Sequence, residues 1–267
     1  MSTKTRIVFV AGGASHGSGS HEHPGGCSFL ADQLNDAVEN MDAVVSKGWP
    51  SDPSLFENTD AIIVYSDGGG GHLCIPHLEQ ISKFAAQGIG IAMLHYAVEV
   101  PKGEPGDRFL EWIGGYFETH LSVNPHWTAE FTGFPEHPVT RGMVPFSLDD
   151  EWYYHMRFPN NMQDVVPVLS AVAPESTLKR PDGPHSGNPH VRASVANGEP
   201  QHLGWCKERQ DGGRGFGFTG GHYHKNWGDD NLRRFILNAI AWTAKLEIPD
   251  EGISTPTPSE ADLNAYL

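Results

Sequence analysis

Histidine is the residue type that this sequence offers most abundantly for chemistry. The chain has 15 histidines against 18 lysines and arginines together. Histidine is both the commonest metal ligand and the usual acid–base side chain near neutral pH. Several histidines follow short apolar runs that are typical of buried strands. They are His16, His21, His72, His95 and His222.

The clearest of these runs is Gly88 to Leu94, which ends at His95. Its apolar part is expected to be a strand covered on both faces. Parallel strands place their carboxyl ends at one edge of a sheet, which is where open α/β sheets bind ligands. We therefore expect four histidine-bearing loops to converge, and we favour a functional cluster over separate structural histidines. The loops follow the predicted strands Arg6–Ala11, Asp60–Tyr65, Gly88–Leu94 and Phe216–Thr219.

Two kinds of chemistry suit such a cluster. A zinc or similar ion needs three or four histidine or carboxylate ligands, with one position open for catalysis. We predict His16, His21 and His222 as ligands of a divalent ion, with zinc favoured. Without an ion, His95 and Glu151 would form an acid–base pair acting on a C–H bond or a sugar hydroxyl. No HExxH motif or other local spacing decides between these alternatives.

The predicted substrate contacts lie near the same strand ends. Asp67 and His72 flank the glycine run Gly68–Gly71, which either lets the backbone approach a ligand closely or forms a mobile loop. Aromatic side chains nearby would suit stacking on a sugar face, although ordinary core packing explains them equally well. The residues predicted to bind substrate are Asp67, His72, His120, Trp127 and Tyr153.

Composition and missing motifs exclude several classes of function. The net charge of -15 and the pI of about 5.3 argue against nucleic acid or an anionic membrane surface as a partner. The loop after the first strand has neither GxGxxG nor a Walker lysine, so no nucleotide cofactor is expected. A serine hydrolase is disfavoured because GxSxG is absent. The three cysteines are far apart in the sequence, which favours free thiols and a cytoplasmic protein.

Strands and helices alternate up to residue 94, which predicts a mostly parallel central sheet with helices on both faces. Residues 128–172 contain short β-like runs that read as an antiparallel extension. Residues 173–200 are rich in Pro, Gly, Asn and Ser and are expected to form a long insertion or lid. We expect one α/β domain over residues 1–249 and a polar tail over 250–267, either disordered or wrapped on the surface. The predicted helices are Gly26–Glu39, Ile75–Gln87, Arg108–Ile113 and Asp230–Leu246, and the β-like runs are Thr128–Phe131, Val144–Leu148, Tyr153–Met156 and Val165–Val172.

An ordered set of short motifs resembles the ThuA-like family, named for trehalose utilisation. The resemblance spans about residues 6–246, and each motif is weak alone, but their order is fairly specific. The motifs are the His16 loop, GIGIAMLH at Gly88–His95, GGYFETH at Gly114–His120, EHPVT at Glu136–Thr140, DEWY at Asp150–Tyr153, and Gly221-His222 before a last helix that ends in Ala241-Trp242.

The resemblance implies a flavodoxin-like, class I glutamine amidotransferase-like fold, which is an α/β three-layer sandwich. In amidotransferases of this fold a catalytic cysteine follows the equivalent strand, where this chain has His95, so glutamine hydrolysis is not expected. The family implies carbohydrate metabolism, including sugars oxidised at C3. The residues that match its recurring polar positions are His16, His95, His120, Glu151 and His222.

The leading hypothesis is an enzyme that acts on a glycoside or keto-sugar by lyase, hydrolase or hydratase chemistry. The carbonyl of a keto-sugar acidifies the neighbouring C–H bond, so one base and a charge on the oxygen suffice for elimination. One alternative is a non-catalytic sugar-binding or regulatory module with the same cleft. Another is a structural role in which the acidic surface and the tail make contacts in a homo-oligomer.

Overall fold

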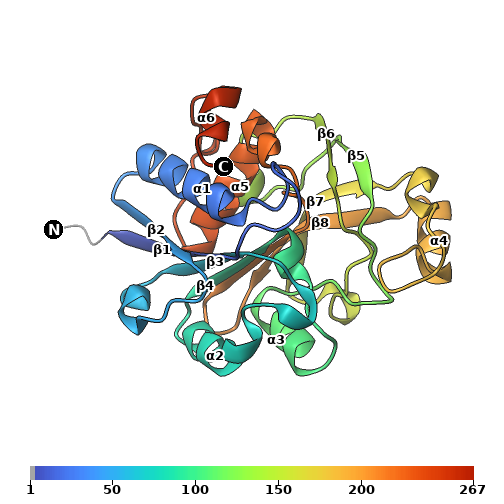
Figure 1. Cartoon of the computed structure of the whole chain (residues 1–267), viewed down its shortest axis with the longest axis horizontal. Coiled ribbons are helices and arrows are strands. Elements are labelled where there is room, and N and C mark those ends of the chain that lie inside the picture. The colour runs from blue at the N-terminus through green and yellow to red at the C-terminus, as the bar shows by residue number, and fades with distance from the viewer. Residues whose placement is uncertain (1–3) are drawn as a thin grey trace.

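The structure is a computed structural model that describes residues 4–267. A seven-stranded sheet forms its centre, with the strand order β2-β1-β3-β4-β9-β8-β7 (Figure 1). β5 and β6 form a separate antiparallel pair. The strands are β1 (Thr5–Ala11), β2 (Met41–Lys47), β3 (Ala61–Tyr65), β4 (Gly90–Leu94), β5 (His126–Phe131), β6 (Phe146–Glu151), β7 (Val165–Val172), β8 (Pro200–Glu208) and β9 (Arg214–Phe218).

Helices cover both faces of the sheet, as the alternating sequence predicts. In Figure 1, α1 and α5 lie on one side of the sheet and α2 and α3 on the other. Strand side chains alternate accordingly: Phe9 belongs to the apolar cluster with α1 and α5, whereas Val8 and Val10 belong to the other cluster. The helices are α1 (His23–Ala37), α2 (Leu78–Ala86), α3 (Glu104–Trp112), α4 (Pro189–Ala196), α5 (Asp230–Thr243) and α6 (Glu260–Asn264).

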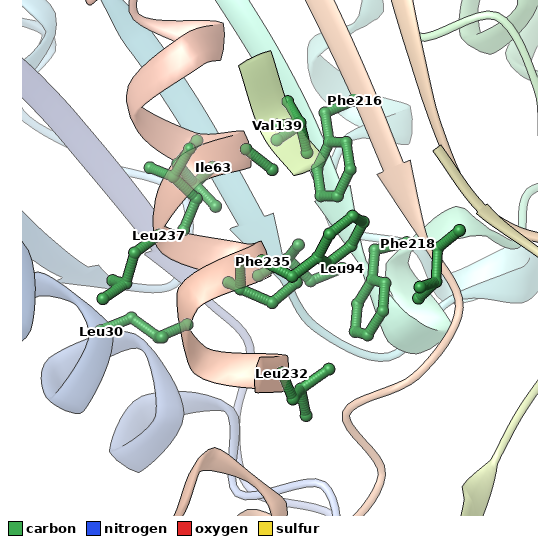
Figure 2. Packing of buried hydrophobic residues seen from close by; sticks show 14 of the residues in the cluster. Leu30, Ile63, Leu94, Val139, Phe216, Phe218, Leu232, Phe235 and Leu237 are labelled. Carbon is green, nitrogen blue, oxygen red and sulfur yellow. The ribbon is translucent and has the colours of Figure 1, made fainter. Parts of the chain in front are cut away.

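The parallel part of the sheet is the part that positions the candidate site. β2, β1, β3, β4 and β9 pair in parallel with one another. Tyr65 is in register with Leu94, and Leu94 with Phe218, so the carboxyl ends of β3, β4 and β9 lie level. Below these ends, Leu94 and Phe218 pack against Phe235 of α5 in a buried core (Figure 2). The loops that follow the strands therefore start from a rigid base.

The antiparallel extension is also present, with altered boundaries. β8 pairs antiparallel with both β7 and β9. β6 begins two residues after the start of the predicted run Val144–Leu148 and continues to Glu151. The predicted strand Tyr153–Met156 is not a strand; only Tyr154 makes an isolated bridge, to Val123. The fold class predicted from the sequence, a mostly parallel α/β sandwich with an antiparallel extension, is confirmed.

The segment predicted as an insertion or lid and the segment predicted as a tail both pack on the rest of the molecule. Residues 173–200 contain a short 3-10 turn and α4. The tail 250–267 wraps on the surface and contains α6, and just after this helix Tyr266 packs against Phe29 of α1. His224 also contacts the tail, since its Nε2 lies 3.0 Å from the carbonyl oxygen of Leu263. Within residues 4–267, no helix is long and apolar enough to cross a membrane.

Candidate functional site

Four ionisable side chains converge at the carboxyl edge of the parallel strands. His21 follows β1, His95 follows β4, His222 follows β9, and Glu151 ends β6. One ligand-type atom from each lies within 4.8 Å of the others, and all four residues are buried. We call this group the histidine–glutamate cluster. Three of the four loops expected to converge thus supply a histidine, and the fourth loop, after β3, supplies Asp67.

The separations within the histidine–glutamate cluster are short. The Nε2 atom of His21 lies 3.1 Å from Nε2 of His95 and 3.0 Å from Nδ1 of His222. Oε2 of Glu151 lies 3.1 Å from His222 Nδ1, 3.5 Å from His95 Nε2 and 3.9 Å from His21 Nε2. Four donor atoms therefore surround one small volume.

Hydrogen bonds at the outer nitrogens determine which atoms face that volume. Nδ1 of His95 lies 2.8 Å from the carbonyl oxygen of Thr219, which can only accept, so this nitrogen carries a proton. Nδ1 of His21 lies 2.9 Å from Oδ1 of Asp67 and donates to that carboxylate. In the neutral rings, Nε2 of both histidines therefore carries a lone pair. Such second contacts are typical of histidines that bind metal ions.

The backbone at two of these histidines is unusual. His95 has φ of 54° and His21 has φ of 50°, a left-handed conformation that residues other than glycine adopt rarely. His95 is the first residue of a 3-10 turn (His95–Val98) directly after β4, so the sharp turn holds its ring at the sheet edge. Strained backbone of this kind concentrates at functional sites.

The loops after β1 and β9 are joined through their backbones. The His21 amide donates to the carbonyl of His222 at 3.0 Å, and the His224 amide donates to the carbonyl of Gly19 at 2.9 Å. Ser20 and Tyr223 form an antiparallel bridge between the same loops. This pairing carries the β1 loop across the ends of β3 and β4 and places His21 beside His222.

Asp150 fixes the position of two members of the histidine–glutamate cluster. Its side chain is fully buried and accepts three backbone N–H bonds, from Glu151 at 2.8 Å, Gly221 at 2.8 Å and His222 at 3.0 Å. The carboxylate thus ties the end of β6 to the loop after β9. Glu151 and His222 are held at a fixed separation as a result.

The neighbouring carboxylates and imidazoles of the site favour one another's charged forms. Burial opposes the ionised form of Glu151, but hydrogen bonds with His21, His222 and His95 outweigh it and lower the pKa of this carboxyl group. Burial likewise opposes the charged form of His21, whereas the neighbouring Glu151 and Asp67 carboxylates raise its pKa. The Tyr153 hydroxyl donates to Glu151 Oε2 at 3.2 Å, and its burial raises its pKa well above the usual value. Glu151 is therefore a carboxylate that accepts hydrogen bonds.

Two further predicted site residues lie beside the cluster. Asp67 contacts His21, and Tyr153 contacts both Glu151 and His95, the latter at 3.3 Å. His16, predicted as a metal ligand, is exposed and belongs to an adjacent group with His21 and Asp67 rather than to the histidine–glutamate cluster. The cluster instead contains His95 and Glu151, which were predicted as an acid–base pair, beside the predicted ligands His21 and His222.

Three residues predicted to bind substrate are placed elsewhere. Both ring nitrogens of His72 are hydrogen-bonded in the protein interior, to Ala97 and Cys74, which leaves none for a ligand. The Trp127 indole is buried and donates to the Trp152 carbonyl, so the core-packing interpretation applies. His120 is exposed, and its backbone bonds to the 173–200 segment.

Four residues near the cluster are absent from the set predicted from the sequence: Asp150, Asn124, His126 and Tyr96. His126 is the neighbour of Trp127 on β5 and lies opposite Glu151 in the β5–β6 register. Strand alternation carries a signal here, because burial alternates along β5 and leaves His126 exposed beside Glu151. Asn124 donates to Glu151 Oε1 at 3.1 Å, and no sequence motif indicates it.

Two solved structures of ThuA-like proteins share this fold. A ThuA-like protein from Bacteroides uniformis has a similar structure, with a TM-score of 0.61 and 16% identity, covering 90% of this chain and 91% of that chain. A ThuA-like protein from Parabacteroides merdae has a TM-score of 0.59 and 12% identity, covering 96% and 98%. A glutamine amidotransferase from Thermotoga maritima gives a TM-score of 0.41 and 9% identity, covering 82% and 76%.

Sequence comparison supplies the assignment. No curated protein matches the chain. The family model ThuA, described as trehalose utilisation, matches residues 13–243, which include all four members of the histidine–glutamate cluster. The chain belongs to the ThuA family.

Proposed function

We propose that the protein is a metal-assisted carbohydrate-processing enzyme that acts on a glycoside or keto-sugar. The observation that carries the proposal is the convergence of three imidazole nitrogens and one carboxylate oxygen in the histidine–glutamate cluster. The family's description, trehalose utilisation, supports a carbohydrate as the substrate class. Lyase, hydratase or hydrolase chemistry would each use such a site.

The donor set fits a divalent ion, with zinc favoured. Ligand atoms about 2.0–2.1 Å from a tetrahedral ion lie roughly 3.3 Å from one another. Five of the six separations in the cluster range from 3.0 to 3.9 Å and bracket that value, and all six lie within 4.8 Å. His21, His95 and His222 would hold the ion, and Asp67 and the Thr219 carbonyl would orient His21 and His95. An ion held there would polarise a carbonyl or hydroxyl oxygen of the substrate.

In this proposal the protein's own residues bind the substrate and move the proton. Glu151 is ionised and lies at the fourth position of the cluster, so it can accept a proton from a C–H bond next to a carbonyl or from water. The Tyr153 hydroxyl keeps its proton and donates to Glu151 Oε2, which orients that oxygen. Tyr96 lies against His21 and Tyr153, with ring centroids 5.9 and 6.4 Å away, and offers a sugar an aromatic face.

The first experiment is elemental analysis of the purified, untagged protein beside His21→Ala and His222→Ala. His77→Ala is the matched control, because His77 stacks on Trp49 away from the cluster. Near-stoichiometric zinc or another transition metal, lost in the first two variants and kept in the control, would support the proposal. No metal after reconstitution would contradict metal assistance.

Turnover is tested next with glycosides and 3-keto-sugars, followed by mass spectrometry of the products. Glu151→Gln keeps the shape of the side chain and removes the base, so we expect turnover to fall by at least about a hundredfold. Sugar binding without turnover, unaffected by Glu151→Gln, would overturn the enzymatic proposal in favour of a binding module.

A further inference from the structure

We infer that Asn124 and Arg180 are positioning residues for Glu151, through which the 173–200 segment orients the carboxylate of the site. This inference rests on the proposed function, in which Glu151 is the acid–base group. Its basis is a continuous chain of two hydrogen bonds. Nη2 of Arg180 donates to Oδ1 of Asn124 at 2.9 Å, and Nδ2 of Asn124 donates to Oε1 of Glu151 at 3.1 Å.

The chemistry of the two end groups fixes the orientation of the amide between them. A guanidinium has only donors, so the Asn124 atom that faces Arg180 must be the oxygen. The amide NH2 group must then face Glu151, where the ionised carboxylate can only accept. Both ends of the chain favour the same orientation, and the opposite orientation would leave two unfavourable contacts.

This arrangement gives the two oxygens of Glu151 different tasks. Oε1 is occupied by Asn124, whereas Oε2 faces His222, His95 and Tyr153. A carboxylate held at one oxygen cannot rotate freely about its last torsion. Asn124 therefore keeps Oε2 directed into the cluster, which is the orientation that a base or ligand there requires.

The 173–200 segment holds Arg180 in place through His185. The same Nη2 atom of Arg180 also donates to the carbonyl of His185 at 2.8 Å. The His185 ring contacts the Glu99 carboxylate, with Nε2 and Oε1 2.8 Å apart, and stacks on Phe117. The segment is thus fastened to the chain that follows β4, and it carries the guanidinium to Asn124.

The second attachment of the segment lies at His120. The His120 amide donates to the carbonyl of Pro184 at 2.7 Å, and Asn188 donates through Nδ2 to the His120 carbonyl at 3.0 Å. His120 lies shortly before Asn124 in the chain. The backbone that carries Asn124 is therefore attached to the same segment that carries Arg180, so a displacement of the segment would move both.

The test uses the full-length protein with Asn124→Ala, Arg180→Ala, Arg180→Lys and the double variant Asn124→Ala/Arg180→Ala. Arg192→Ala is the matched control, because Arg192 belongs to the same segment but pairs with Asp182. Two readouts are measured. One is the affinity and visible absorption spectrum of bound Co²⁺. The other is the ring nitrogen NMR signals of His95 and His222 in the metal-free protein.

We expect Asn124→Ala and Arg180→Ala each to shift the His95 and His222 signals and to weaken Co²⁺ binding about tenfold, because the Glu151 carboxylate that they orient lies against His95 and His222, two of the proposed ligands. The double variant should be no worse than Asn124→Ala, because Arg180 acts through Asn124. Arg180→Lys should restore part of the effect, since lysine also only donates. Arg192→Ala should match the wild type.

Additive effects in the double variant, or a silent Arg180→Ala beside an active Asn124→Ala, would overturn the inference. Circular dichroism identifies a variant that fails to fold, and Arg180→Lys then carries the comparison. If the wild type binds no Co²⁺, metal assistance fails separately. The NMR signals of the metal-free protein still decide the inference in that case.

Discussion

The Nε2 atoms of His21 and His95 face one another across 3.1 Å, although both carry lone pairs when the rings are neutral. Two facing lone pairs repel, so a cation or a proton between them is needed to make the contact favourable. The Asp67 carboxylate and the Thr219 carbonyl prevent either ring from relieving the conflict by moving its proton inward. The pair is therefore arranged to share a positive charge.

The first prediction is that zinc stabilises the folded protein. An ion that binds only the folded state at about 100 times its dissociation constant adds about 2.7 kcal/mol to the free energy of unfolding. We expect the Tm to rise with zinc and to fall with a chelator, and His21→Ala to abolish both shifts. Differential scanning calorimetry measures them. An equal response in His21→Ala would mean that the ion binds elsewhere, and His77→Ala shows the response of an unrelated histidine variant.

The second prediction concerns Asp150, which is fully buried and accepts three backbone N–H bonds. Asp150→Asn turns one acceptor oxygen into an NH2 group that faces backbone donors. We expect a loss of about 1–3 kcal/mol in the free energy of unfolding, together with weaker metal binding because Glu151 and His222 move apart. Urea denaturation measures the loss.

Asp149→Asn is the matched control for this prediction, since Asp149 is adjacent and exposed. It should change the free energy of unfolding by less than about 0.5 kcal/mol. Comparable losses in the two variants would show that the net charge of this segment matters, and not the three buried hydrogen bonds.

The third prediction concerns the glycine run after β3. A Cβ atom on Gly68 would lie 2.2 Å from the Tyr96 carbonyl oxygen and 2.7 Å from that of Glu99, whereas a Cβ on Gly70 would meet nothing within 4 Å. Gly68→Ala must therefore displace the loop that carries Asp67. We expect it to weaken zinc binding, measured by competition with a chelator, while Gly70→Ala binds as the wild type does. Equal affinities in the two variants would contradict this account.

Much of the fold was predictable because it depends on local patterns. The apolar runs of β1, β3 and β4, each followed by a loop that carries Gly or His, indicate a parallel sheet and the edge at which His95 lies. His222 joins the cluster, whereas His224, two residues later, contacts the tail.

The rest of the site depends on contacts between loops, which sequence patterns do not encode. His21 rather than His16 lies in the cluster because the backbone of its loop pairs with the β9 loop. His126 rather than Trp127 lies beside Glu151 because of the β5–β6 register. His72 follows a strand as the other histidines do, but its ring turns into the core. The Arg180–Asn124 contact joins residues 56 apart and has no local signal.

The last prediction is a pH dependence of the anchor between His185 and Glu99. The hydrogen bond from the His185 ring to the Glu99 carboxylate, opposed by partial burial, raises the pKa of His185 above 6.5, with the Glu99 charge adding to it. Arg180 and Glu151 also act on this ring, in opposite directions. Because the folded-state pKa is the higher one, the stabilisation is fully present below about pH 6.5 and is lost as the pH rises through the raised pKa.

We expect the free energy of unfolding of the wild type to exceed that of His185→Gln by a margin that shrinks between about pH 6 and pH 9. Urea denaturation of both proteins across this range measures the margin. A margin that stays constant or grows would show that Glu99 does not stabilise the protonated ring.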